Sequence, residues 1–159
     1  MRVCVLAQAS PSTWVTHYVR AFRACCDTFV VGPEPDAAAL EAWGRSDAGH
    51  LVTPNDAACD FEGEDVDLGA LLPEGWEPEL VVGISGIGGA RLYREVARLP
   101  WPKAFLSIDT WQCLLDYREA LGYDFVFVAQ REFVEHMRAA GAARVSWLPL
   151  ACAPDVHYP

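Results

Sequence analysis

The chain has 159 residues, of which 52% are hydrophobic, and its formal net charge at pH 7 is −10. This length suits one domain with a packed core, and the hydrophobic fraction excludes a disordered segment. An acidic surface repels phosphate backbones, so we expect no nucleic acid among the partners. The apolar runs are far shorter than the roughly 20 residues of a membrane-spanning helix, so we expect no membrane span.

The first apolar run, over residues 2–6, predicts a strand. Gln8, Ser10 and Pro11 interrupt it before it reaches the length of a signal-peptide core, so we expect a cytoplasmic protein. The loop that follows, residues 7–12, lacks the G-x-G-x-x-G glycines of a dinucleotide site. We therefore assign no bound cofactor to this domain.

Hydrophobic periodicity and turn residues predict alternating strands and helices along the rest of the chain. Strands are expected over residues 2–6, 28–31, 79–84, 103–108, 125–129 and 145–150. Helices are expected over residues 14–25, 36–43, 66–72, 90–99, 111–121 and 132–140, with Gly141 ending the last one in a left-handed conformation. Trp76 is expected to pack a loop against the core. This alternation predicts a Rossmann-like three-layer α/β sandwich with a mostly parallel sheet.

Metal-binding patterns are missing from the sequence. The six cysteines contain no C-x-x-C pair and the four histidines no H-x-x-x-H, so we predict no metal site. The adjacent Cys25 and Cys26 are either a redox-active pair or the end of a buried helix face.

Ligands of open α/β sheets bind outside the carboxyl ends of the strands, which selects residues 8–13, 85–89, 109–111 and 130–131 as the rim of one cleft. Glycines 86, 88 and 89 either present backbone N–H groups to an anion or only allow a tight turn. Asp109 either caps the next helix or points into the cleft. The substrate-binding candidates near these loops are Ser10, Ser12, Trp14, Ser85, Gly86, Gly88, Gly89, Trp111, Gln130 and Arg131.

Several segments together resemble the N-terminal half of a CgeB-like (spore-maturation type) glycosyltransferase of GT-B architecture. They are residues 10–12 with 14–17, 107–109, 123–130, and 147–152 with 154–157. The resemblance covers the two ends and the chain from about Leu80 onward, and the acidic middle has none of it. In that family two Rossmann-like domains face each other, and the N-terminal one mostly receives the acceptor.

The resemblance implies that residues 1–150 form an acceptor-side domain and that residues 151–159 connect it to a second domain. The nucleotide sugar would be the donor substrate of the complete enzyme, and a small molecule or glycan would be the acceptor. Activity would need a donor-binding domain, on this or another chain. His17 and Asp109 are the candidates for deprotonating the acceptor hydroxyl, and Arg131 for stabilising the leaving diphosphate.

Two alternatives remain open at this stage. The alternative for His17 is an ordinary helix histidine without a catalytic role. The alternative for the whole domain is a non-catalytic binding or assembly module. Under either function, the open face of the domain allows a homo-oligomer through Trp14, Trp111 and His157.

Overall fold

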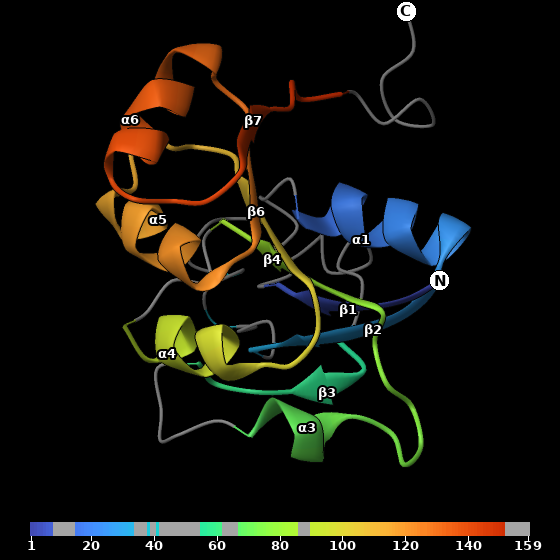
Figure 1. The fold of residues 1–159 in the computed structure, drawn as a ribbon. Coiled ribbons are helices and arrows are strands. Elements are labelled where there is room, and N and C mark those ends of the chain that lie inside the picture. Colours follow the sequence, from blue (N-terminus) through green and yellow to red (C-terminus); the bar gives the residue numbers. More distant parts are fainter. Residues whose placement is uncertain are drawn as a thin grey trace, which may run out of the picture.

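The fold is known from a computed structural model, which describes residues 1–7, 15–33, 38, 41, 55–61, 67–85 and 90–151 (Figure 1). Except at positions 38 and 41, the helix predicted over residues 36–43 lies outside this part of the chain.

The centre of the molecule is a seven-stranded sheet in the order β3-β2-β1-β4-β5-β6-β7, in which all neighbouring strands are parallel. Its strands are β1 (Arg2–Leu6), β2 (Asp27–Gly32), β3 (Ala57–Ala58), β4 (Leu80–Ile84), β5 (Lys103–Ser107), β6 (Phe125–Val128) and β7 (Val145–Trp147). The predicted Rossmann-like α/β class is confirmed, and the sheet is parallel throughout.

Helices cover both faces of this sheet, because each parallel connection must cross one face before the next strand begins. Figure 1 shows α4, α5 and α6 on one side and α1 on the other. The described helices are α1 (Val15–Cys25), α3 (Leu68–Leu71), α4 (Ala90–Arg98), α5 (Leu114–Glu119) and α6 (Val134–Ala139), with 3₁₀ turns η2 (Ala120–Gly122) and η3 (Arg131–Phe133). None of these described helices is long and apolar enough to cross a membrane.

The largest departures from the sequence prediction concern β7, α5 and β3. β7 stops at Trp147, three residues early, and α5 begins three residues late at Leu114. The two-residue strand β3 was not predicted, since two alanines carry no strand signal. Gly141, with φ of 101°, has the left-handed conformation expected after α6.

The aromatic side chain of Tyr123 packs across the centre of the sheet. Tyr123 stacks on Phe105 of β5, with ring centroids 5.1 Å apart and an interplanar angle of 30°. Its hydroxyl lies over Gly83 of β4, where an added Cβ would clash with the Tyr123 oxygen. A glycine in the middle of β4 is therefore required by this close approach.

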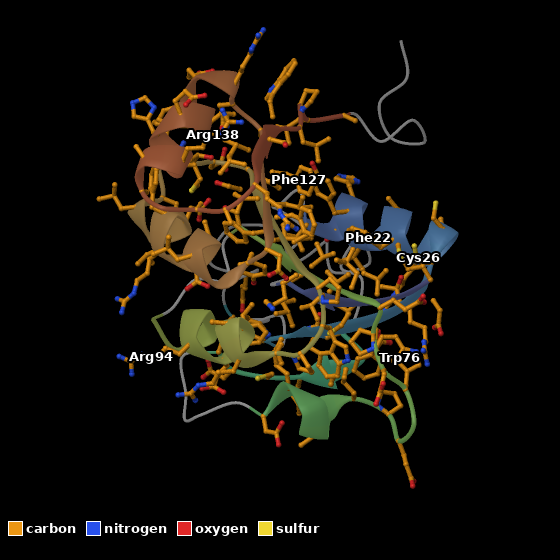
Figure 2. All side chains as sticks on the ribbon, viewed as in Figure 1. Phe22, Cys26, Trp76, Arg94, Phe127 and Arg138 are labelled. Carbon is orange, nitrogen blue, oxygen red and sulfur yellow. The ribbon has the colours of Figure 1, made fainter. Side chains whose placement is uncertain are left out.

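Further contacts near the two borders of the sheet hold neighbouring segments against it. As predicted, Trp76 packs its loop down, because its ring lies 5.7 Å from that of Phe29 and its Nε1 donates to Asp27 at 3.1 Å (Figure 2). At the other edge, Nη2 of Arg138 on α6 donates to the carbonyl oxygen of Val145 in β7 at 2.7 Å.

Replacing Gly83 by alanine tests the Tyr123 contact. The new methyl group overpacks the sheet centre, so we expect the free energy of unfolding to fall by about 3 kcal/mol, measured by urea denaturation. Gly69→Ala is the control, because the nearest atom to its Cβ is the Asp67 side-chain oxygen at 3.2 Å and alanine favours the helix. Equal stability of Gly83→Ala and the wild type would contradict the described packing.

Candidate functional site

Because all strands are parallel, their carboxyl ends meet at one edge of the sheet. Ser85 directly follows β4, Ser107 ends β5, and Asp109 lies two residues further on. Gln130 and Arg131 come after β6. Four of the predicted candidates thus belong to loops that leave the same edge.

A buried carboxylate joins these loops. Asp116 of α5 is only 2% exposed, and its Oδ2 accepts a hydrogen bond from the Ser107 hydroxyl at 2.5 Å. Ser107 Oγ also lies 2.6 Å from the Thr110 hydroxyl, which must be the donor because the Ser107 proton goes to Asp116. The Ser85 and Cys113 side chains hydrogen-bond to the same carboxylate. Asp116 therefore ties the ends of β4 and β5 to the β5–α5 loop.

The charge state of Asp116 is set by opposing effects. Burial raises the pKa of the Asp116 carboxyl, while hydrogen bonds from Ser107, Cys113 and Ser85 lower it and the Asp109 charge raises it. The pKa of the Cys113 thiol is raised by its burial and then by the Asp116 charge, so the thiol stays protonated at neutral pH and can donate. Asp116 is thus a buried, hydrogen-bonded acid that fixes the geometry of the loop between β5 and α5.

Asp109 and Trp111 form the outer part of this loop. Asp109 is half-buried, and its carbonyl oxygen accepts from the backbone N–H groups of Gln112 at 2.9 Å and Cys113 at 3.3 Å. The N-cap of α5 is Cys113, so the suggestion that Asp109 caps this helix is wrong. The Trp111 side chain is 60% exposed next to it. The loop thus presents a carboxylate and an indole at the sheet edge.

His17 is placed differently from Asp109. It is half-buried in the first turn of α1 and has an interaction partner within the chain. α1 covers the face of the sheet opposite to α5 (Figure 1). The two catalytic candidates therefore lie in different parts of the fold, His17 in α1 and Asp109 in the loop that leads to α5, and Asp109 is the one associated with the buried polar cluster.

The loops after β6 and β7 continue the edge. Gln130 Nε2 donates to the carbonyl oxygen of Ile108 at 2.5 Å, which connects the β6 loop to the β5 loop. Gln130 Oε1 is buried and has no hydrogen-bond partner among the described residues. The Arg131 guanidinium lies 5.6 Å from the centroid of the Trp147 ring, and Trp147 Nε1 donates to the carbonyl oxygen of Ala129 at 3.1 Å.

The remaining candidates of the sequence analysis lie outside the described residues. They are Ser10, Ser12, Trp14, Gly86, Gly88 and Gly89. Among the residues that are described, no three His, Cys, Asp or Glu side chains gather into a metal-binding group.

Sequence reasoning missed Asp116, included Thr110 only in the rim of the cleft, and used Ser107 and Trp147 only as parts of a resemblance. A weak signal for the cluster exists, since Ser107 and Thr110 are small polar residues at the end of an apolar strand and an acid follows in the next helix. No periodicity shows that this acid turns inward.

Comparisons of the chain with protein-family models, with curated proteins and with solved structures find no significant match.

Replacing Asp116 by asparagine removes the buried acid but keeps its shape. Because the pKa is raised in the folded chain, the stabilisation from this carboxyl is complete below its unfolded pKa of about 3.9 and is lost as pH rises through the folded pKa. The stability of Asp116→Asn relative to the wild type should thus increase with pH from about 4 upward, by at most about 1.4 kcal/mol per pH unit.

Urea denaturation over a pH series measures this difference. Ser107→Ala is the companion variant, since it keeps the acid but removes a donor that lowers its pKa. Its pH dependence should extend to higher pH than that of the wild type. A stability difference between Asp116→Asn and the wild type that stays constant with pH would contradict the buried state of Asp116.

Proposed function

We propose that this chain is the acceptor-side domain of a nucleotide-sugar-dependent glycosyltransferase of GT-B architecture, similar to the CgeB-like family. It acts together with a donor-binding domain that holds the nucleotide sugar. The observation that supports this most is the β5–α5 loop, where Asp109 and the exposed Trp111 are held at the carboxyl edge by the buried Asp116 cluster.

The chemistry assigned to this loop is acceptor binding and deprotonation. An exposed indole offers an apolar face on which the C–H face of a sugar ring stacks, while its neighbouring carboxylate accepts hydrogen bonds from sugar hydroxyls. Asp109 then acts as the general base that takes the proton of the attacking hydroxyl. The buried cluster contributes by fixing the loop, so that the carboxylate does not have to be ordered at each turnover.

We place this reaction in the cytoplasm. Support comes from the five described cysteines, which are all free: Cys4, Cys25, Cys26, Cys59 and Cys113. Free thiols are the usual state in a reducing compartment.

A binding panel tests the assignment of this half. We expect sugars to shift amide resonances of the loop around Trp111 in two-dimensional NMR spectra, and Trp111→Ala to abolish these shifts. Nucleotides and nucleotide sugars should leave the thermal midpoint unchanged, because their site belongs to the other domain. Tight binding of a nucleotide sugar to this chain would contradict the acceptor-side assignment.

The catalytic step is tested with the complete enzyme, assembled with its donor-binding domain. Asp109→Asn should reduce kcat by 10²-fold or more, the usual effect of losing a general base, while the thermal midpoint stays within about 1 °C. His17→Ala is the parallel variant, since His17 was the other candidate base. Loss of turnover in His17→Ala alone would transfer the role to His17.

A second candidate function, a non-catalytic binding or assembly module, is favoured by one observation. Trp111, Leu114 and Leu115 are 60%, 84% and 50% exposed, so apolar side chains gather at the start of α5. Under this alternative, Leu114→Glu should dissociate an oligomer or partner complex in sedimentation velocity. A monomer that binds sugars favours the transferase domain instead.

A further inference from the structure

Arg131 lies at the carboxyl edge of the sheet and makes a cation–π contact with Trp147. Its guanidinium lies over the Trp147 ring at 5.6 Å, and the indole is itself fixed by its hydrogen bond to the Ala129 carbonyl oxygen. The preceding residue, Gln130, is anchored through its amide to the carbonyl oxygen of Ile108. Both the backbone beneath Arg131 and the platform under its side chain are therefore fixed before any ligand arrives.

The guanidinium has no anionic partner within the described residues. Four other basic side chains there are paired with carboxylates: Arg23 with Asp56, Arg98 with Glu95, Lys103 with Asp124, and Arg138 with Glu135. The Arg131 side chain forms no ion pair or hydrogen bond within the described residues, although acidic residues outnumber basic ones by 22 to 12 in the chain. A cation–π contact uses none of the guanidinium N–H groups in a hydrogen bond, so these donors stay available for a planar or tetrahedral oxyanion.

The position of Arg131 relates it to the acceptor loop. The hydrogen bond from Gln130 to Ile108 joins the β6 loop to the residue that directly precedes Asp109. Arg131 and Asp109 therefore lie on adjoining loops at the same edge of the sheet.

We propose that Arg131, positioned by Trp147, binds an oxyanion carried by the acceptor, either a phosphate monoester or a carboxylate. This inference rests on the proposed function, because it takes the acceptor to be the molecule whose hydroxyl lies at Asp109. The net charge of −10 disfavours loose accumulation of anions around the chain, so binding depends on direct, bidentate hydrogen bonds from this one guanidinium. The acceptor is accordingly an acidic or phosphorylated sugar and not a neutral one.

Four probes that separate charge from sugar test the proposal: glucose, glucose 6-phosphate, glucuronate and inorganic phosphate. Their affinities for the purified chain are measured by NMR titration at constant ionic strength. We expect glucose 6-phosphate or glucuronate to bind at least tenfold more tightly than glucose, and Arg131→Gln to remove this preference. The tighter of the two anionic sugars identifies the oxyanion as phosphate or carboxylate. Arg131→Lys should keep only part of the preference for anionic sugars over glucose, because an ammonium cannot form the bidentate pair.

Two matched arginine variants serve as controls. The Arg144 guanidinium stacks on Phe125 at 5.0 Å, and Arg144 precedes β7 at the opposite, amino edge of the sheet. Arg94 projects into solvent from α4 (Figure 2). Arg144→Gln and Arg94→Gln remove the same charge, so each should change the affinity for glucose 6-phosphate less than twofold.

Each outcome bears on the proposal. Equal weakening in Arg131→Gln and in the controls, or anion binding that does not depend on Arg131, overturns it. Binding of glucose as tight as that of the anionic sugars overturns it as well but leaves the acceptor-side function intact. Inorganic phosphate that binds through Arg131 while no sugar binds supports the oxyanion site and counts against the proposed function. Absence of binding by every anionic probe overturns the site.

Discussion

Because all seven strands run in one direction, the places where a ligand site can form are restricted. Every connection has to cross a face of the sheet, so both faces are covered and the residues on them are used for packing. Only at the edges do loops leave the packed layers. At the carboxyl edge the ends of β4, β5, β6 and β7 lie side by side, and the polar residues that follow β4, β5 and β6 are held in register by the strands.

The buried Asp116 converts this edge from a set of separate loops into one unit. A carboxylate removed from water is costly unless donors surround it, and here Ser107, Ser85 and Cys113 supply them from three consecutive segments. A network of this kind specifies one arrangement, because any shift of a segment leaves part of the carboxylate unsatisfied. The hydrogen bond from the Gln130 amide to the Ile108 carbonyl oxygen likewise fixes the loop after β6.

The sequence predicted the order and type of the elements well because they depend on local patterns. Val126 and Val128, for instance, belong to an apolar run of strand length, and both are fully buried. The exact start of α5 was missed because backbone turns at Asp109 hold residues that resemble a helix start. β3 was missed because it forms by pairing with β2 and not by its own propensity.

The candidate site was predicted only in part, for a related reason. The carboxyl-edge rule located Ser85, Asp109 and Arg131 from their places after strands. The role of Asp116 was not predicted, because no local sequence pattern shows that an acidic residue of a helix is buried. The hydroxyls that stabilise its carboxylate come from two other segments. The stacking of Arg131 on Trp147 likewise joins residues that only the sheet brings together.

The contact between Arg138 and Val145 affects how the molecule behaves in a crowded solution. Arg144 O and Leu148 N bond to β6, so by the alternation of a strand the carbonyl of Val145 points away from the sheet. An outward row of such groups invites a strand from a neighbouring molecule, and the guanidinium occupies the first acceptor in that row. The opposite border, β3, has two residues and is too short to template a foreign strand. The sheet thus ends at both borders in ways that oppose fibre-like growth.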